Sequence, residues 1–523
     1  MVFDKLSSVL ESEVVKIITN SKSTTCGLDP LPAYLVKSCL LELSPIITRI
    51  INMSFHEGHF PDRLKHANVS PLLKNANLDS DDLKNYRPIA NLAFLGKTIE
   101  RAAISQFQEH LVCNNLQPST QSAYRSHHSC ETALVRVYND ILLALDKGEE
   151  AILLLLDYSA AFDTIRHDVL LQRLQERFGI QDGALDWLKS YLLNRSQSVV
   201  IDNNESETHF PAQGVPQGSV LGPLMFTLFS SPLEDIVKSH DIACMMYADD
   251  TQIYLTLKQD NMSNVLLKLE ACVKDIKNWS TTNGLKLNEG KTEILHFTSR
   301  FRSCIPISQF VFDNHNINPV SSARNLGVIF DKHLTMSNHV NLICKTASFA
   351  LHKISSIRKY LDQKTTETLV HSLVMSRIDS CNSLLFGLPE SQINKLQRLQ
   401  NSAARLVTRT RPRDPITPIL CNLHWLPVHA RIKFKILILT FHCLQSTAPV
   451  YLQDLVQKYT PNRNLRSKSK SLLVTPTVVT KSYGARSFQV AAPELWNSLP
   501  EFVKEAVTPA QFKNRLKTHL FIV

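Results

Sequence analysis

The chain has 523 residues, of which 44% are hydrophobic and 20% are charged, so a globular protein of several domains is expected and a disordered or fibrous one is excluded. Its formal net charge of +10 is unevenly placed, because residues 391–523 hold 20 basic and 5 acidic side chains while residues 1–390 carry a net charge of −5. A basic segment of this kind indicates a polyanionic partner, either a nucleic acid or an anionic membrane surface.

The cysteines and the N-terminus narrow the class of protein further. No two of the eleven cysteines form a Cys-x-x-Cys pair, which argues against a zinc ribbon, and their odd number argues against a complete disulfide framework. The N-terminus lacks the basic start and apolar core of a signal peptide, and no apolar run is long enough to cross a bilayer. We therefore expect an intracellular protein in a reducing compartment, without a membrane partner.

The first half of the chain is expected to alternate helices with buried strands. Apolar residues at helical spacing predict one buried helix from Tyr34 to Phe55, and a short apolar segment follows at Val69–Leu73. The continuous apolar run Ala151–Leu156 predicts a strand buried on both faces. Helical sequence then extends from His167 to Leu193.

The second half begins with a hairpin and continues with long helices. Residues Ile242–Leu257 are apolar on both sides of the pair Asp249-Asp250, which predicts two strands with their turn at the aspartates. Long helices are expected at residues 340–361, 365–378 and 391–408. The last hundred residues contain more prolines, and their pattern predicts no particular fold.

Carboxylates stand at the ends of two of the expected strands. Asp157 directly follows the buried strand, and Asp249 and Asp250 occupy the hairpin turn. If the two strands lie side by side, Asp157 and Asp249 can share a pair of divalent cations, an arrangement suited to in-line phosphoryl transfer. Each aspartate by itself is more often a turn former or a helix cap.

A loop rich in glycine and proline, Gln213–Pro223, is the third feature. Its low side-chain bulk allows a base, sugar or phosphate to approach the backbone closely, although such a loop alone is usually only a connection. Taken together and in this order, the loop and the two carboxylate sites favour a functional interpretation.

The chain resembles the reverse transcriptases of non-LTR (LINE-type, jockey-like) retrotransposons. The matching segments occur in the family's order at residues 60–74, 85–89, 157–163, 214–223, 247–250, 283–292 and 325–328. The resemblance implies an α+β right-hand polymerase with fingers, a palm that contains an antiparallel sheet, and a helical thumb, followed by a basic C-terminal region. It also implies an RNA-directed DNA polymerase that adds dNTPs to a DNA 3′-hydroxyl.

The same resemblance implies domain boundaries. Residues 1–150 would form an N-terminal extension and the fingers, and residues 151–335 the palm with finger insertions, with a reverse transcriptase core at about 65–335. Residues 336–420 would form the thumb, and residues 421–523 the basic C-terminal region.

The resemblance also assigns catalytic and metal-binding roles. Asp157, Asp249 and Asp250 would bind two Mg²⁺ ions, for which Mn²⁺ can substitute. Lys291 would donate a proton to the pyrophosphate leaving group, and the ring of Phe162 would act as a steric gate against a ribose 2′-hydroxyl.

A dNTP pocket is implied for four further residues. Lys74 and Arg87 would clamp the triphosphate, and Gln217 and Gly218 would line the nucleotide and template pocket. For Lys74, Arg87 and Lys291 the alternative is a solvated surface charge.

The basic segment supplies a candidate surface for nucleic acid. Lys395, Arg398, Arg405 and Arg409 recur opposite the apolar face of the expected helix at 391–408. Cationic loops are expected at 411–413, 431–435 and 463–470. With the polymerase motifs upstream, binding of an RNA–DNA duplex is favoured over a membrane surface or a solvated helix face.

The implied partners are an RNA template, a DNA primer or target, dNTPs, and an endonuclease domain encoded upstream. Since nothing resembling that domain precedes Met1, the chain is expected to be a fragment or a degraded copy of an element. Priming at a chromosomal nick would place it in the nucleus, with a cytoplasmic ribonucleoprotein phase. Two alternatives stay open, a decayed or domesticated protein that only binds nucleic acid, and a two-metal nuclease.

Overall fold

The computed structural model of the chain describes residues 2–75, 77–202, 204–258, 260–300, 310–312, 315–460 and 471–522. The chain folds into two compact units. The first consists of Met1–Tyr124, Tyr158–Ile236 and Lys274–Asn288, and the second of Arg125–Asp157, Val237–Val273 and Glu289–Val523. Both contain helices and sheets, which confirms the expected α+β class.

The first unit begins with four helices, α1 (Glu11–Asn20), α2 (Ala33–Ser38), α3 (Leu40–His56) and α4 (Phe94–Cys113). The single buried helix expected from Tyr34 to Phe55 is therefore wrong in two respects. Cys39 (φ −104°, ψ 36°) leaves the helical region and separates α2 from α3, and several apolar side chains of the two helices, Leu41 and Ile46 among them, are exposed. Apolar periodicity continues across this break, so the pattern alone does not reveal it.

A four-stranded sheet of order β2-β1-β5-β6 belongs to this unit. Its strands are β1 (His66–Leu73), β2 (Tyr86–Asn91), β5 (Ser196–Ile201) and β6 (Asn204–Glu205). The small pair β4 (Tyr158–Ser159) and β9 (Lys286–Leu287) also lies in the unit. Parallel pairing of β1 with β5 joins residues about 130 positions apart in the chain, a pairing that no local pattern predicts.

Helices α6 (His167–Phe178), α7 (Asp182–Leu192) and α8 (Gly222–Phe229) complete the first unit, while α9 (Pro232–Ser239) and α10 (Met262–Thr282) contribute residues to both units. The helical stretch expected at His167–Leu193 is thus two helices. Gly179 ends α6 in the left-handed conformation (φ 65°), the usual conformation of a glycine that terminates a helix.

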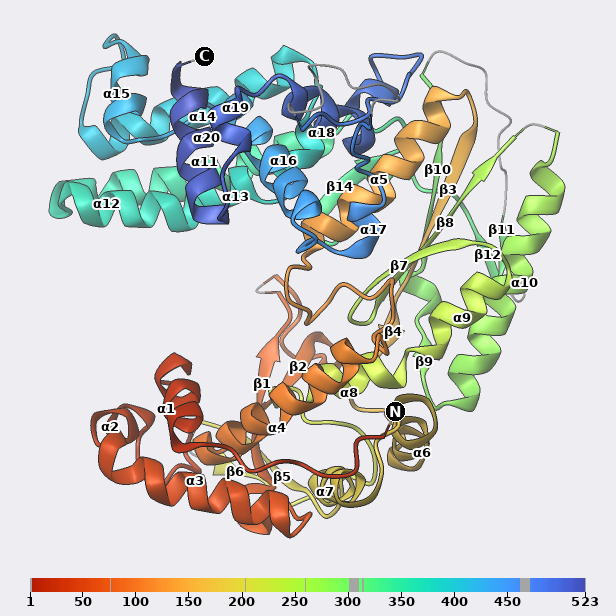
Figure 1. Cartoon of the computed structure of the whole chain (residues 1–523), viewed down its shortest axis with the longest axis vertical. Coiled ribbons are helices and arrows are strands. Elements are labelled where there is room, and N and C mark those ends of the chain that lie inside the picture. Colours follow the sequence, from red (N-terminus) through yellow and green to blue (C-terminus); the bar gives the residue numbers. More distant parts are fainter. Residues whose placement is uncertain are drawn as a thin grey trace. The chain divides into compact units, whose positions relative to one another are not determined.

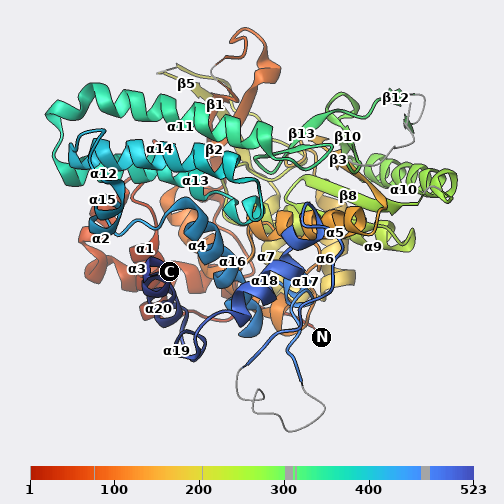
Figure 2. The ribbon, with the colours of Figure 1, turned by 90° about the horizontal axis from the view of Figure 1, so that it is seen from above.

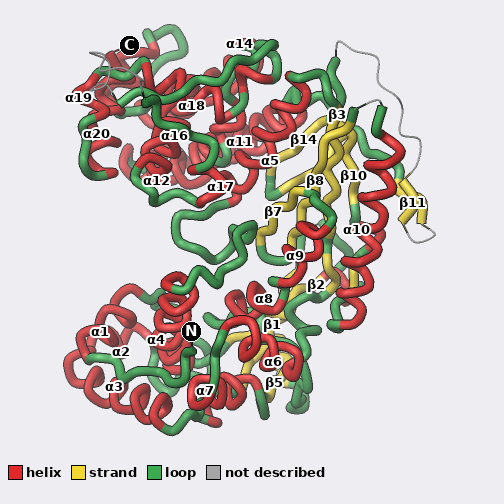
Figure 3. Tube along the Cα trace, turned by 45° about the vertical axis from the view of Figure 1, so that its right-hand side comes forward, coloured by secondary structure: helices red, strands yellow, loops and turns green. Residues whose placement is uncertain are grey.

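The second unit is built on an antiparallel sheet of order β10-β3-β8-β7, whose strands lie side by side in Figure 3. They are β3 (Glu150–Leu156), β7 (Ala243–Tyr247), β8 (Asp250–Leu257) and β10 (Glu293–Phe297). Helix α5 (Cys130–Asp146) packs against this sheet (Figure 1). The strand and the hairpin expected from the apolar runs are both confirmed, and β3 is buried along nearly all of its length.

Two short hairpins and a group of helices follow in the second unit. The hairpins are β11 (Phe310–Phe312) with β12 (His315–Ile317), and β13 (Ser322–Asn325) with β14 (Val328–Asp331). Helix α11 (Ser337–Ile357) packs along α14 (Glu390–Thr408), as Figure 2 shows. Between them the expected helix at 365–378 is interrupted, because α12 (Gln363–Val370) passes through a π-helical turn at His371–Met375 into α13 (Ser376–Asp379).

Helix α15 (Ile416–Asn422) comes just before the last hundred residues, for which the sequence predicts no fold. The described part of those hundred residues contains α16 (Val428–Leu444), α17 (Val450–Gln453), α18 (Phe488–Asn497), α19 (Glu501–Lys504) and α20 (Pro509–Ile522). The cationic loop expected at 431–435 is instead part of α16.

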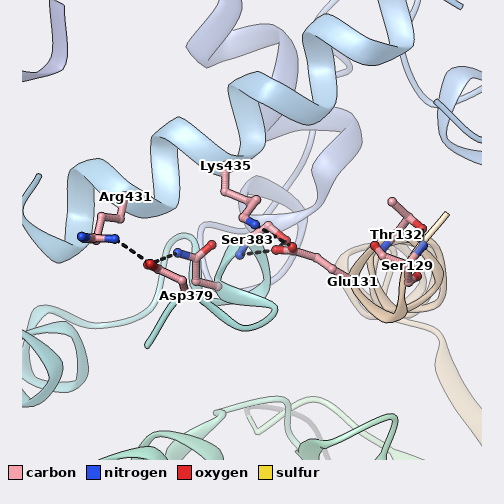
Figure 4. Close-up of polar contacts among 8 residues, drawn as sticks. Ser129, Glu131, Thr132, Asp379, Ser383, Arg431 and Lys435 are labelled. Carbon is pink, nitrogen blue, oxygen red and sulfur yellow. Dashed lines mark hydrogen bonds and ion pairs between the residues drawn. The ribbon is translucent and has the colours of Figure 1, made fainter. Parts of the chain in front are cut away.

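Two cations of α16 pair with carboxylates of other elements (Figure 4). Arg431 lies 2.6 Å from Asp379, and Lys435 lies 3.2 Å from Glu131, which also accepts hydrogen bonds from the backbone and hydroxyl of Ser383. Their charge therefore serves to fasten α16 to α13 and α5. It does not form the cationic loop that was expected to meet phosphates.

The segment before α18 is fastened to α5 by buried polar groups. The carboxylate of Asp146 accepts hydrogen bonds from the backbone of Val479 (3.0 Å) and of Thr480 (2.7 Å), and the buried guanidinium of Arg486 donates to Tyr138. Because buried polar groups are costly when unpaired, these contacts fix the C-terminal segment in the same core as α5.

A buried histidine in α11 gives the second unit a pH-dependent stability. Burial, with a smaller contribution from Arg324, lowers the pKa of His339 to about 4, and its Nδ1 accepts a 3.4 Å hydrogen bond from the backbone of Ile329. Since the unfolded chain binds this proton near pH 6.5, the free energy of unfolding should fall by up to about 3 kcal/mol between pH 7 and pH 4.

Urea unfolding of the wild type and of His339→Gln at pH 7, 5.5 and 4 tests this expectation. Glutamine can accept the same backbone hydrogen bond but does not titrate, so the stability difference between the two proteins should shift in favour of the variant as the pH falls. A difference that is the same at all three pH values would contradict it.

None of the helices in the described ranges is both long enough and apolar enough to cross a membrane.

Candidate active site

The register of the second unit's sheet brings three of the predicted site residues to one edge. Strand β3 pairs with β8 up to Leu156 opposite Thr251, and β7 pairs with β8 up to Tyr247 opposite Asp250. Asp157 is the next residue after β3, and Asp249 lies in the turn between β7 and β8. All three carboxylates, including Asp250, therefore lie at the same end of the sheet.

The turn that carries Asp249 is backbone-strained. Residues Ala248 and Asp249 connect the two strands, and Ala248 adopts a left-handed conformation (φ 56°). A residue with a Cβ pays about 1 kcal/mol or more for that conformation, and such strain is concentrated at functional sites. Asp249 is half-buried and Asp250 is exposed, so only the former is held within the packed edge of the sheet.

Lys291 joins the same group. It lies just before β10, and its ammonium is 3.3 Å from Oδ2 of Asp157. The Asp157 side chain is 29% exposed and the Lys291 side chain 64% exposed, so the pair is open to solvent and to a ligand. Lys291 was expected to be either a proton donor at the site or a solvated surface charge. Its contact with Asp157 favours a role at the site.

The donor set at this edge suits magnesium. Within the described ranges no three histidine, cysteine, aspartate or glutamate side chains are grouped so as to enclose a metal ion. Mg²⁺, however, is usually held by one or two carboxylates together with substrate phosphates and water, and not by a cage made wholly of protein. The carboxylates of Asp157 and Asp249 therefore fit an ion that is completed by a bound triphosphate.

The other predicted site residues lie in the first unit, where the glycine-rich loop gathers them. The ring of Phe162 stacks on that of Phe226 in α8, with 5.0 Å between centroids and 25° between planes. The backbone of Val215 donates a 2.9 Å hydrogen bond to the carbonyl of Phe162. The side chain of Gln217 donates to both carboxylate oxygens of Asp163, at 3.0 and 2.9 Å.

Burial raises the pKa of Asp163, and the hydrogen bond from Gln217 partly offsets that rise.

The glycine-rich loop packs closely against two backbone segments. A Cβ at Gly218 (φ 133°) would overlap the carbonyl oxygen of Ala90, whose own N–H donates a 2.8 Å hydrogen bond to Gln217. A Cβ at Gly214 (φ 88°) would lie 2.7 Å from the carbonyl oxygen of Asp163. Glycine is needed at both positions because of this close approach.

Lys74 and Arg87 lie on the β1–β2 hairpin of the first unit. Leu72 pairs with Arg87, and the backbone of Lys74 donates a 2.8 Å hydrogen bond to Asn85, which continues the ladder past the end of β1. Residues two apart in a strand share a face, so this register places both cations on one face of the hairpin. Both side chains are exposed, and the Lys74 ammonium donates to the carbonyl of Lys84.

A buried glutamate that the sequence did not single out holds this loop. Oε2 of Glu100 in α4 accepts hydrogen bonds from the backbone of Val220 (2.7 Å) and Leu221 (2.9 Å), the residues that precede α8. Burial raises the pKa of Glu100, while those two N–H groups and Arg195 act in the opposite direction.

One signal in the sequence could have revealed this glutamate. Glu100 falls between Gly96 and Phe107 at helical spacing on the apolar face of α4, where a charge is out of place.

Residues Asn325–Val328, one of the matching segments, form the turn of a hairpin. Leu326 (φ 43°) and Gly327 (φ 89°) make a two-residue turn between β13 and β14, and the side chain of Asn325 donates a 2.8 Å hydrogen bond to Gln252. Gln252 lies two residues after Asp250 in β8, so this hairpin is tied to the sheet that carries the carboxylates.

The cations of α14 divide into two groups. Lys395, Arg398 and Arg409 are exposed, and Arg405 is half-buried. Arg405 and Arg409 donate hydrogen bonds to main-chain carbonyls of neighbouring segments, whereas Lys395 donates a 3.0 Å hydrogen bond to the side chain of Asn341 in α11. Arg405 and Arg409 thus help to hold the end of the helix in place, while Lys395 and Arg398 lie on its exposed side. The cationic stretch at 463–470 lies outside the described residues.

Much of the chain is similar to known proteins. Residues 73–330 match the family described as reverse transcriptase (RNA-dependent DNA polymerase). Over 419 residues the chain is 28% identical to the RNA-directed DNA polymerase from mobile element jockey of Drosophila melanogaster, a match that covers 77% of this chain and 44% of that protein. It is 27% identical over 408 residues to the probable RNA-directed DNA polymerase from transposon BS of the same fly, covering 76% and 44%.

The chain therefore spans less than half the length of these relatives. Among solved structures, an apo telomerase from Candida tropicalis truncated of its C-terminal domain is 12% identical with a TM-score of 0.35, covering 51% of this chain and 55% of that one.

Proposed function

We propose, on the premise that residues 73–330 form a reverse transcriptase domain of the non-LTR retrotransposon type, that the chain is an RNA-directed DNA polymerase. It would add dNTPs to a DNA 3′-hydroxyl on an RNA template. The observation that carries the proposal is the sheet register that brings Asp157, Asp249 and Asp250 to one edge.

Asp157 and Asp249 would hold two Mg²⁺ ions, or Mn²⁺ in their place, with Asp250 completing the site. When bound, the ions activate the attacking hydroxyl and stabilise the charge on the leaving oxygen. Lys291, whose ammonium lies 3.3 Å from Asp157, would give a proton to the pyrophosphate. Lys74 and Arg87 would neutralise the triphosphate, because charge-assisted hydrogen bonds to phosphate are among the strongest available to a protein.

Phe162 would exclude ribonucleotides, with Gln217 and Gly218 lining the same pocket. The ring of Phe162 is fixed by stacking on Phe226. Because it cannot move aside, it would clash with a ribose 2′-hydroxyl.

Replacing Phe162 with valine is therefore expected to raise the incorporation of rNTPs relative to dNTPs by roughly 10- to 200-fold, the range that one steric contact supplies. Single-nucleotide insertion with matched rNTP and dNTP substrates measures this ratio. Phe162→Tyr keeps the ring and should retain discrimination, so an unchanged ratio in Phe162→Val would contradict the role of the ring.

The boundaries proposed for the right-hand architecture are the N-terminal extension and fingers at 1–150, the palm at 151–335, the thumb at 336–420 and the basic region at 421–523. An RNA template, a DNA primer or target and dNTPs would be the partners, with an endonuclease domain encoded upstream. The exposed cations Lys395 and Arg398 support binding of an RNA–DNA duplex by phosphate contacts. Priming at chromosomal DNA would place the protein in the nucleus after a cytoplasmic ribonucleoprotein phase.

Primer extension by the purified chain tests the proposal. A labelled DNA primer on an RNA template should lengthen in the presence of dNTPs and Mg²⁺, and Asp249→Ala should abolish that product. Shortening of either strand would indicate the two-metal nuclease. Binding of RNA without extension in Mg²⁺ or Mn²⁺ would indicate a decayed or domesticated protein.

A further inference from the structure

Two exposed aromatic rings stand on one face of α11 and its 3₁₀ extension, Arg358–Tyr360. The side chain of Phe349 is 61% exposed and that of Tyr360 77% exposed. Each has a lysine ammonium over its ring, Lys353 at 4.6 Å and Lys359 at 4.8 Å from the centroids. These rings and cations are called the aromatic–lysine stripe.

The stripe lies opposite the buried face of α11. Val340, Ile343, Ala347, Ala350 and Ile354 form that buried face, and at 100° per residue Phe349 falls roughly 140° away from its centre, while Tyr360 lies in the 3₁₀ extension and is exposed. Neither ring can therefore serve the core. Single exposed apolar residues are common, but two rings of one stripe, each beside an ammonium, form a repeated arrangement.

A groove of about 540 Å³ lies between α11 and α14, which lie side by side in Figure 2, and its lining residue His352 is one helical turn from Phe349. Its walls include the hydroxyls of Ser348, Ser355 and Ser402 together with Lys395 and Arg398. Lys345 stands between the groove and Phe349 on the helical projection. The groove offers cations and hydroxyl donors, which suit phosphate oxygens.

Charge decides the class of partner. Residues 337–360 contain four basic residues and no acidic one, and residues 390–409, which cover α14 and its C-cap, contain four basic residues and one acidic one, Glu390. Arg358 is not available for binding because it is buried and donates to the carbonyls of Leu406 and Val407. The remaining surface is cationic with exposed rings, and this combination is typical of sites for unpaired nucleotides, whose bases stack on aromatic side chains.

We propose that the stripe and the groove together form a binding site for single-stranded RNA. Phosphates lie along Lys395 and Arg398, and unpaired bases stack on Phe349 and Tyr360. The two rings are roughly 17 Å apart along the helix axis, a span that an extended strand of several nucleotides covers. A duplex offers phosphates to the groove but no free base to the rings. The proposal rests on the proposed function only in taking nucleic acid as the partner.

Equilibrium anisotropy of the full chain with a labelled single-stranded RNA, and separately with a blunt RNA–DNA duplex, tests the site. The double variant Phe349→Ala/Tyr360→Ala is compared with the ring-retaining Phe349→Tyr/Tyr360→Phe. The first should weaken single-strand binding at least tenfold, by about tenfold for each base that stacks, while the second stays within twofold of the wild type. Duplex binding should change by less than twofold in both.

Salt separates stacking from charge. The ratio of the single-stranded RNA affinities of the wild type and of Phe349→Ala/Tyr360→Ala should stay the same at high salt. The loss of RNA affinity caused by Lys395→Gln/Arg398→Gln should become smaller, because only phosphate contacts depend on counterion release.

Three results would overturn the proposal. They are unchanged single-strand affinity in the alanine variant, an equal loss of duplex affinity, and binding of the rings to anionic phosphatidylserine vesicles without an effect on RNA. Exposed rings leave the fold intact, and equal melting temperatures of both variants check this point. Primer extension measured in parallel on a short template reports on the polymerase separately, since RNA binding needs no catalysis.

Discussion

Asp157→Asn and Asp249→Asn should each lower the rate of nucleotide addition about a thousandfold or more. A metal ion at a transferring phosphoryl group contributes several kcal/mol to transition-state stabilisation, and each 1.4 kcal/mol changes the rate tenfold. Asparagine keeps the shape of the side chain but removes the negative charge that would hold the ion. Pre-steady-state insertion of one dNTP measures the rate.

Asp241→Asn is the matched control for these variants. Asp241 lies two residues before β7 in the same unit, its side chain is 97% exposed, and it pairs with Lys268 at 3.1 Å. Removing this surface charge should leave the insertion rate within twofold of the wild type, since exposed ion pairs contribute little. Equal losses of insertion rate in all three variants would contradict this expectation. They would show that the rate depends on the net charge of the protein and not on the carboxylates at this end of the sheet.

Gly218→Ala should destabilise the first unit by about 2–5 kcal/mol and reduce nucleotide addition more than tenfold. The new Cβ would overlap the carbonyl of Ala90, and the backbone there has φ 133°. Overpacking costs about 1–3 kcal/mol, and a strained backbone conformation costs a similar amount. The loop can relieve the clash only by moving Gln217 away from Asp163 and from the N–H of Ala90.

Gly327→Ala separates strain from overlap. Gly327 also has a positive φ (89°), but a Cβ there would meet no atom within 4 Å. The free energy of unfolding of the Gly327→Ala variant should therefore be only about 1 kcal/mol below that of the wild type. Urea unfolding of both variants compares the two costs, and equal destabilisation would contradict the close packing of Gly218 on Ala90.

The sequence predicted those parts of the site that depend on local pattern. The apolar run before Asp157 predicts one strand and the apolar residues on both sides of Asp249 and Asp250 predict two more, and all three are present with the carboxylates at their ends. The glycines of the loop likewise signal close backbone approach, which Gly214 and Gly218 show. In each case the signal comes from residues that are neighbours in the chain, although the segments that the two glycines approach, at Ala90 and Asp163, are distant in sequence.

The rest depends on contacts between distant residues, which local periodicity does not reveal. Glu100 captures the backbone of Val220 and Leu221 about 120 positions away, and Glu131 accepts from Ser383 about 250 positions away. The same limitation applies to Lys435, whose charge looked like part of a nucleic-acid surface but pairs with Glu131. A count of basic residues does not separate cations that bind inside the fold from those that face a partner.

If the chain copies RNA by template-directed addition at the edge of β3 and β8, the template base must decide which nucleotide is added. This is measured by insertion of each of the four dNTPs opposite each base of an RNA template, with Mg²⁺ and the purified chain. We expect that the complementary dNTP alone is inserted efficiently and that Asp249→Asn removes this insertion while RNA affinity is retained. Insertion that ignores the template base, or that persists in Asp249→Asn, would contradict it.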